Sequence, residues 1–159
     1  MHDAADLIPM IRRGGVFYNV SGDTVDAIYS DVASQVILPA SVDRDFFRVG
    51  LCERERLMTT AIGNGIAIPH PRTPLVQSEA DERVYVCFLD KPSDFGAMDG
   101  KPVFILFVIL SSGSSSHLKV LSRLSWLFQK DAFRDALRKK PDTEELISVI
   151  KKYSQGALS

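Results

Sequence analysis

Among the side chains of this sequence, His70 has the surroundings that best suit chemistry. It stands between Pro69 and Pro71 and follows the short apolar run 66–68, which has the composition of a strand. Because neither proline has a backbone N–H to donate, a regular element must end here, and we expect the imidazole at a strand end on a stiff support. This placement suits a reactive ring, and it equally suits a histidine that only holds a loop by hydrogen bonds.

The turn ahead of that strand and the arginine behind the histidine are neighbouring candidates. Gly63 and Gly65 flank Asn64, and all three residue types tolerate positive φ, so the sequence predicts a tight, shaped turn. Arg72 lies in the same stretch, just after His70. We therefore include Gly63, Asn64, Gly65 and Arg72 among the candidate binding residues.

A second reactive candidate is His117, which follows Ser114, Ser115 and Ser116 at the predicted start of a helix. The first turn of a helix leaves backbone N–H groups unpaired and carries a partial positive charge, so it can bind phosphate. The same charge disfavours a protonated imidazole, and we expect a neutral ring here. Ser115 and Ser116 are included as candidate binding residues. The alternative is that a serine caps the helix and His117 is merely exposed.

The third candidate is an arginine in the charged run Glu53-Arg54-Glu55-Arg56. Such a run is usually a solvated helix face. If the fold carries Arg54 to the two histidines, its guanidinium is suited to clamping a phosphoryl group with paired N–H donors.

The spacing of apolar residues predicts strands mixed with helices throughout the chain. The runs 84–89 and 103–110 lack polar alternation, which is typical of strands buried on both faces and covered by helices on each side. Further strands are expected at 16–20, 58–61 and 66–68. Helices are expected at 3–12, at 23–36, from Ser41 with Val42, Phe46 and Val49 on one face, from near Ser116, at 131–138, and from Asp142, where Asp142 and Glu145 form a capping box. The fold class is therefore α/β, with a sheet between helical layers.

Length and composition limit the possible functions. The 159 residues, 45% of them hydrophobic, suit a single domain over residues 1–159. A net charge of −1 argues against a nucleic-acid binder that works by bulk charge, and the longest apolar run, 103–110, is far shorter than the roughly 20 residues of a membrane helix. The two cysteines suit free thiols in a reducing cytoplasm. Without a P-loop, GxGxxG, GxSxG or HExxH motif, we expect no cofactor and no metal.

Residues 54–70, with the sequence RERLMTTAIGNGIAIPH, resemble the active-site signature of the type-2 IIA proteins of the bacterial phosphoenolpyruvate:sugar phosphotransferase system (PTS). This fructose/mannitol IIA family includes the nitrogen-regulatory IIA proteins, to which the signature is most similar. The resemblance extends more loosely over about residues 15–153. The chain departs from common versions at Pro71, where a small residue such as glycine is frequent, and at Thr60-Ala61.

The resemblance implies a single-domain mixed β-sheet flanked by helices on both faces. It also implies that His70 is the phosphorylated residue, that Arg54 contacts the phosphoryl group and that His117 is the second active-site histidine. The phosphoryl donor would be a small histidine-phosphorylated carrier protein of the HPr type.

Several functions are compatible with these residues. The first is a nitrogen-regulatory IIA-like protein whose phosphorylation state controls its binding to target proteins. The second is the IIA component of a fructose- or mannitol-type sugar permease, which would pass the phosphoryl group to a IIB partner. A third is an interaction module that is never phosphorylated, and a fourth is a metal-dependent hydrolase that uses both histidines. We expect the first, because the signature is most similar to that subgroup.

Overall fold

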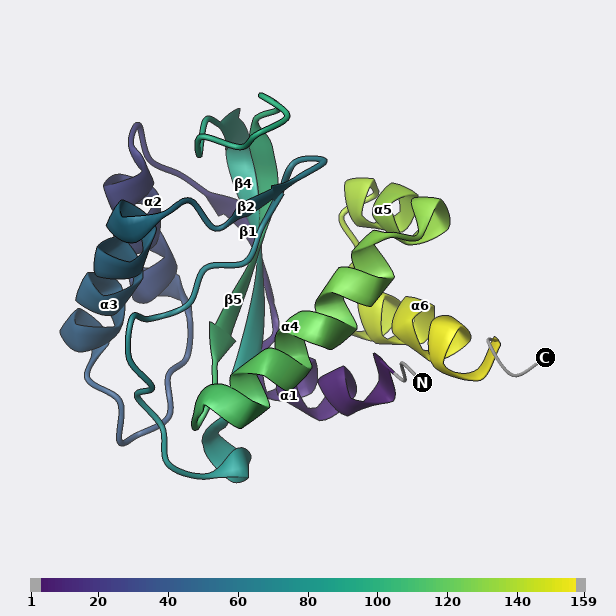
Figure 1. Ribbon diagram of the computed structural model, residues 1–159, viewed down its shortest axis with the longest axis horizontal. Coiled ribbons are helices and arrows are strands. Elements are labelled where there is room, and N and C mark those ends of the chain that lie inside the picture. Colours follow the sequence, from purple (N-terminus) through teal and green to yellow (C-terminus); the bar gives the residue numbers. More distant parts are fainter. Residues whose placement is uncertain (1–3, 157–159) are drawn as a thin grey trace.

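The fold is built on a five-stranded mixed sheet, and the structure, a computed structural model, describes residues 4–156 (Figure 1). The strands are β1 (Val16–Val20), β2 (Ala61–Gly63), β3 (Ile66–Ala67), β4 (Arg83–Ser93) and β5 (Val103–Leu110), in the order β1-β4-β5-β3-β2 across the sheet. The β1–β4 and β3–β5 pairs are parallel, and the β4–β5 and β2–β3 pairs are antiparallel.

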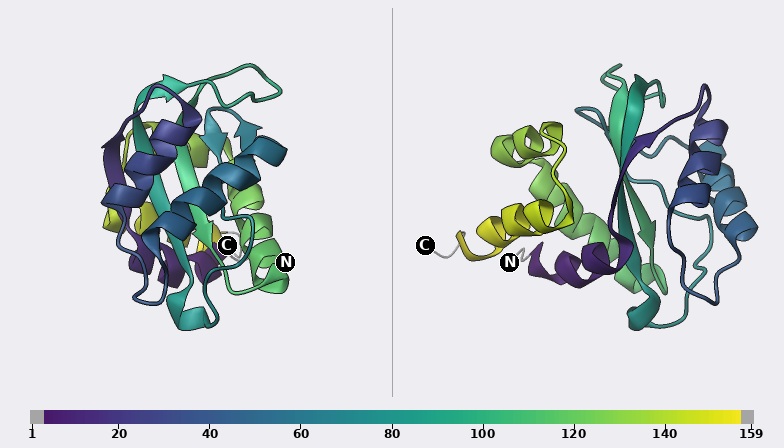
Figure 2. Two further views of the ribbon diagram at one scale, coloured as in Figure 1. Left: turned by 90° about the vertical axis from the view of Figure 1, so that its left-hand side faces the viewer. Right: turned by 180° about the vertical axis from the view of Figure 1, so that it is seen from behind.

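Helices cover both faces of this sheet, as predicted. Helices α2 (Val25–Gln35) and α3 (Arg44–Leu57) lie on one face, and α1 (Leu7–Gly14), α4 (Ser114–Phe128), α5 (Asp131–Arg138) and α6 (Thr143–Gly156) lie on the other (Figures 1 and 2). Short 3-10 helices, η1 (Ala4–Asp6) and η2 (Glu79–Asp81), precede α1 and β4.

Strands β4 and β5 supply the centre of both core layers. Val86 and Phe107 are buried in the layer that contains α1, α4, α5 and α6, whereas Tyr85 and Val108 are buried in the layer that contains α2 and α3. Successive side chains of a strand point to opposite faces, so a strand that is buried on both sides needs apolar residues at every position. This burial confirms the interpretation of the two unbroken apolar runs.

Helix α3 differs from the prediction in its start and in its buried face. Its N-cap is Asp43, whose carboxylate accepts a hydrogen bond from the backbone N–H of Phe46 at 2.9 Å. Ser41 therefore does not cap this helix. Phe47 is completely buried and Phe46 is 69% exposed, so the predicted buried face was wrong. Serine and aspartate are both good N-caps, and spacing alone does not choose between them.

The N-termini of α4 and α6 differ in how well the sequence predicted them. Helix α4 begins at Ser114, earlier than the predicted Ser116, and its N-cap, Gly113, makes no side-chain capping bond. At α6 the predicted capping box is confirmed. The Asp142 N–H donates to the Glu145 carboxylate at 3.0 Å, and the Glu145 N–H donates to the Asp142 carboxylate at 2.8 Å.

The ends of the chain lie outside the described part of the structure. The predicted opening helix, 3–12, corresponds to helical residues 4–14, and its first residue is not described. The predicted domain limits at residues 1 and 159 are likewise not described. Within residues 4–156, no helix is both long enough and apolar enough to cross a bilayer.

Candidate active site

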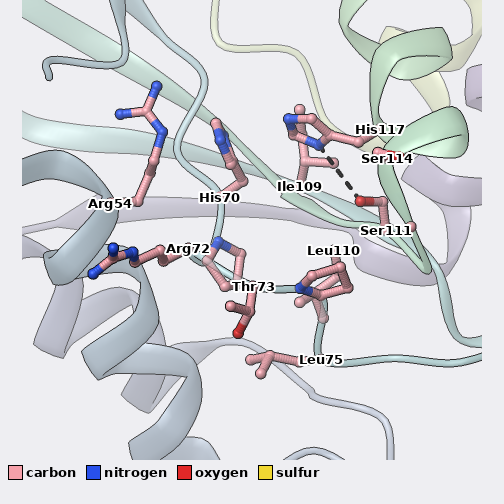
Figure 3. Close-up of a pocket in the computed structure, with 13 residues that line it drawn as sticks. Arg54, His70, Arg72, Thr73, Leu75, Ile109, Leu110, Ser111, Ser114 and His117 are labelled. Carbon is pink, nitrogen blue, oxygen red and sulfur yellow. Dashed lines mark hydrogen bonds between the residues drawn. The ribbon is translucent and has the colours of Figure 1, made fainter. Parts of the chain in front are cut away.

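A cavity of about 230 Å³ brings together residues that are far apart in the sequence (Figure 3). It lies where the end of α3, the segment after β3, the end of β5 and the first turn of α4 meet. The lining residues are Arg54, His70, Pro71, Arg72, Thr73, Pro74, Leu75, Ile109, Leu110, Ser111, Gly113, Ser114 and His117. The fold therefore places the three residues expected to do chemistry, His70, His117 and Arg54, in one site.

The position of His70 follows from the strand that precedes it. The carbonyl of Pro69 accepts a hydrogen bond from the backbone N–H of Ile109 in β5 at 2.9 Å, which ties the chain to the sheet just before the histidine. The His70 ring nitrogen Nδ1 lies 3.1 Å from the carbonyl oxygen of Ile68. Because a carbonyl can only accept, Nδ1 carries the proton, and Nε2 keeps its lone pair.

His117 faces His70 across the cavity. The two ring centroids are 4.3 Å apart, and the ring planes are inclined by 55°. The Ser111 hydroxyl lies 3.5 Å from Nδ1 of His117 (dashed in Figure 3). His117 is in the second turn of α4, and its backbone N–H donates to the carbonyl of Gly113, the N-cap, at 3.0 Å.

Burial and positive charge keep both rings neutral at pH 7. Burial lowers the pKa of His117 to about 4, with further lowering by His70 and Arg54. Burial also lowers the pKa of His70, the hydrogen bond to Ile68 opposes that change, and Arg54 adds to it. A neutral imidazole has a free lone pair, so His70 is in the protonation state that a nucleophile needs.

Arg54 reaches the cavity from the last turn of α3. Its Nη1 donates to the carbonyl of Met58 at 2.7 Å, a group that the end of the helix leaves without an intrahelical partner. Arg54 lies to one side of His70, and His117 lies on the other (Figure 3). The guanidinium of Arg54 and the two imidazole rings thus border one cavity, which a phosphoryl group could occupy.

Glu55, next to Arg54, fixes the connection from α3 to β2, and the sequence analysis gave it no role. Its carboxylate accepts hydrogen bonds from the Tyr29 hydroxyl at 2.5 Å, the Thr60 backbone N–H at 2.7 Å and the Thr60 hydroxyl at 2.8 Å. These bonds hold α3 against α2 and β2. In the sequence Glu55 is one acid in a charged run, and nothing in that pattern indicates its partners.

Glu82, which sequence analysis also missed, anchors the loop before α4. Only 4% of Glu82 is exposed, and its carboxylate accepts hydrogen bonds from the Ser112 N–H at 2.8 Å, the Ser112 hydroxyl at 2.9 Å and the Ser116 hydroxyl at 2.5 Å. Burial raises the pKa of Glu82, but these hydrogen bonds lower it more, and the net effect is a pKa below its usual value. Glu82 therefore holds the first turn of α4 in place.

The serines and Arg72 have different positions relative to the cavity. Ser114 lines the cavity, whereas Ser115 is exposed and is not among the lining residues. The Ser116 hydroxyl is used by Glu82. Arg72 lines the cavity and lies 3.8 Å from the Glu53 carboxylate. Of the predicted binding residues outside the glycine turn, Arg72 alone lines the cavity.

The predicted turn at 63–65 is present, but it lies outside the cavity. It joins β2 to β3, and Gly63, Asn64 and Gly65 all have positive φ, at 96°, 56° and 81°. The Asn64 N–H donates to the Asp99 carboxylate at 2.8 Å. A Cβ atom on Gly65 would approach the Phe104 ring to 2.6 Å, so only glycine fits there. The turn shapes the sheet edge, and we do not include it in the proposed site.

No group of three or more His, Cys, Asp or Glu side chains that could hold a metal occurs within the described part of the chain, residues 4–156. The cavity residues that carry charge or a reactive ring are the two arginines and the two histidines. These groups suit an anion, and above all a phosphoryl group, which has three oxygens to accept hydrogen bonds.

The fold and this site define a class of protein that comparison with known families identifies. Residues 10–153 match the family described as phosphoenolpyruvate-dependent sugar phosphotransferase system, EIIA 2, and the chain belongs to that family. The chain is similar to proteins named nitrogen regulatory protein. It is 35% identical over 151 residues to that of Pseudomonas aeruginosa, covering 92% of this chain and 96% of the relative. It is also 35% identical over 128 residues to that of Bradyrhizobium diazoefficiens, covering 78% and 80%.

Solved structures show the same fold. The nitrogen regulatory protein IIA-Ntr from Neisseria meningitidis superposes with a TM-score of 0.73 at 23% identity, over 92% of this chain and 97% of that one. The predicted family and fold class are confirmed by these matches. The chain is thus a IIA protein of the phosphotransferase system, and its relatives include nitrogen regulatory proteins.

Proposed function

We propose that this chain accepts a phosphoryl group on Nε2 of His70 from an HPr-type carrier and acts as a regulator through its phosphorylation state. The observation that carries the proposal is the Nδ1 contact of 3.1 Å with the Ile68 carbonyl, because it leaves Nε2 as the nitrogen with a lone pair. The match of the chain to nitrogen regulatory proteins supports the regulatory role.

In the transfer step, Nε2 of His70 attacks phosphorus in line with the bond to the donor's ring nitrogen. The new N–P bond forms as the old one breaks, and the electron pair of the old bond returns to the donor ring. Each imidazole keeps the proton on its other nitrogen, so only the phosphoryl group is transferred. On His70 that proton stays hydrogen-bonded to the Ile68 carbonyl, which favours the cationic ring of the product.

The groups around His70 suit the charge that develops in this step. The transition state spreads negative charge over three equatorial oxygens. Arg54 lies beside His70 and can donate to these oxygens, while the first turn of α4 offers backbone N–H groups and a partial positive charge. The neutral His117 ring can donate one N–H to the same oxygens.

Phosphorylation changes the charge of the cavity and hence the partners that fit it. A phosphoryl group adds roughly two negative charges to a site that now holds two neutral rings and two arginines. A target protein that docks over the unphosphorylated form therefore meets a different surface after transfer. The proposed donor is a cytoplasmic carrier, so we place the chain in the cytoplasm. The free buried thiols of Cys52 and Cys87 fit that compartment.

The test is phosphorylation by purified PTS components. Incubation with phosphoenolpyruvate, the first PTS enzyme and an HPr-type carrier should add one acid-labile phosphate, as read by intact-protein mass spectrometry. His70→Ala should abolish the label, and His117→Ala should slow it. The sequence has one other histidine, His2. His2→Ala is the matched control and should label at the parental rate. Labelling of His70→Ala at the parental rate would show the proposal to be wrong.

A further inference from the structure

The segment that carries His70 is held on both sides, and one of these sides is helix α3. Before the histidine, the Pro69 carbonyl is bonded to Ile109 of β5. After it, the backbone N–H of Arg72 donates to the carbonyl of Gly50, in the middle of α3, at 3.0 Å. Residues 69–72, which include His70, therefore form a strap between the sheet and α3. At its far end the backbone of the strap lies directly against the backbone of α3.

That approach is possible because residue 50 has no side chain. A Cβ atom on Gly50 would lie 3.0 Å from Cβ of Pro71 and 3.4 Å from its Cα atom. Contacts at 3.0 Å are tighter than ordinary carbon–carbon van der Waals separations of about 3.5–4.0 Å. Pro71 is buried, and its side chain cannot rotate away because the ring is closed onto the backbone nitrogen. A side chain at position 50 therefore requires α3 and the strap to move apart by a few tenths of an ångström.

Gly50 lies on the same side of helix α3 as Arg54, the arginine of the site. Residues four apart lie on the same side of a helix, so Gly50 stands one turn below Arg54. The surface of α3 that contacts Pro71 thus continues into the side chain that faces His70. Arg54 and Arg72 lie on the same side of the cavity in Figure 3, with His70 beside them. A change in the spacing between α3 and the strap therefore changes the spacing between Arg54 and His70.

We propose that Gly50 is a positioning residue for phosphoryl transfer, which sets the distance between Arg54 and His70 through its contact with Pro71. The expected effect on the rate of phosphoryl transfer rests on the proposed function, whereas the expected effect on the distance between Arg54 and His70 does not. Gly50 touches no reacting atom. A mid-helix glycine ordinarily costs helix stability, so its place in α3 is explained by this contact rather than by the helix.

The decisive variant is Gly50→Ala. Alanine improves helix propensity, so helix propensity alone predicts a higher midpoint of urea unfolding and an unchanged transfer rate. We expect Gly50→Ala to fold and its phosphorylation rate at His70 to fall about three- to tenfold, because a displacement of a few tenths of an ångström at the reacting centre is costly. Parental transfer by Gly50→Ala would overturn it.

A double variant assigns the effect to Pro71. Pro71→Gly removes the Cβ atom that lies 3.0 Å away and leaves the Cα atom at 3.4 Å, close to ordinary contact. In that background the Gly50→Ala change should cost nothing, so Gly50→Ala/Pro71→Gly should transfer at the rate of Pro71→Gly alone. A full additional loss in the double variant would show that the contact with Pro71 is not the cause.

An NMR titration separates this inference from the proposed function. Burial lowers the pKa of His70 and the charge of Arg54 lowers it further, so moving the guanidinium away in Gly50→Ala should raise the His70 pKa toward 6.5, and the Pro71→Gly background should remove the change. A titration curve identical to that of the parent would refute the positioning role even if transfer were slower. If the parent is not phosphorylated at all, the proposed function fails, and the titration still decides the role of Gly50.

Discussion

Replacing Glu82 with alanine removes the anchor of the loop that leads into α4. The Glu82 carboxylate is buried and accepts three hydrogen bonds, from the backbone and hydroxyl of Ser112 and from the hydroxyl of Ser116. The Arg13 side chain, which donates to the Glu82 carbonyl at 2.8 Å, adds a favourable charge nearby. Alanine leaves the loop donors without this acceptor.

The size of the effect follows from the number and kind of these bonds. Hydrogen bonds to a charged group contribute about 1.5–3 kcal/mol each, and the freed serine hydroxyls can regain part of that from water. We therefore expect Glu82→Ala to lower the free energy of unfolding by about 3 kcal/mol. Glu82→Gln is the matched control. All three bonds go to one carboxylate oxygen, which the amide oxygen can replace, so its cost should be about 1 kcal/mol.

The pH dependence of stability supplies a second test of the same anchor. The folded pKa of Glu82 lies below its ordinary value of 4.5, so the ionised carboxylate stabilises the fold above that pH. This contribution is lost as the pH falls from about 4.5 through the folded pKa. Glu82→Gln has no such group, so the difference in stability between parent and Glu82→Gln should shrink as the pH falls.

Urea unfolding followed by circular dichroism measures these free energies, and single-turnover phosphorylation measures the rate of transfer to His70. Glu82→Ala should slow transfer more than Glu82→Gln does, because His117 and the first turn of α4 depend on the loop. If Glu82→Ala unfolded within about 0.5 kcal/mol of the parent, as an ordinary surface substitution does, the buried anchor would be refuted.

Three further predictions concern other parts of the fold. Tyr29→Phe removes the 2.5 Å hydrogen bond to Glu55 and should lower the free energy of unfolding by about 1.5 kcal/mol, whereas no change in urea unfolding would mean that the bond contributes nothing. Asp142→Ala removes half of the α6 capping box and should cost about 1 kcal/mol in the same assay; a cost near zero would contradict the capping geometry. His117 has a pKa of about 4 when folded and an ordinary value of 6.5, so the unfolded chain binds more protons between these values, and stability should fall as the pH drops from about 6.5 to about 4. This loss is at most about 3 kcal/mol, less the part that solvent screens, and the melting temperature of the parent should fall relative to that of His117→Gln as the pH drops over this range. Parallel melting curves across that range would show that His117 is not held neutral.

Local patterns in the sequence were enough to predict most elements of the fold. The apolar runs in β4 and β5 needed only the two-residue period of a strand to be recognised as buried on both faces. The capping box of α6 depends on Asp142 and Glu145 alone, and it forms as predicted. At α3 the same reasoning predicted the wrong buried phenylalanine, because Phe46 and Phe47 point about 100° apart around the helix and packing against α2 and the sheet selects the face that is buried.

The chemistry of the site was also visible in part. A histidine between prolines at a strand end, and another at a helix start, are local features, and the signature at 54–70 added the family, which the comparisons confirm. The turn at 63–65 shows the limit of this reasoning. Its glycines were expected from their backbone freedom, but the need for Gly65 comes from the Phe104 ring, a contact that lies far along the chain.

The sequence by itself determined most of the strands and helices, which residues could react, and the family to which they belong. Only the tertiary structure decided that the rings of His70 and His117 lie 4.3 Å apart and that Glu82 and Gly50 hold the two sides of the site. The physical reason is one of range. Periodicity and capping act between residues a few positions apart, whereas these contacts join distant segments and exist only once both helical layers have packed on the sheet.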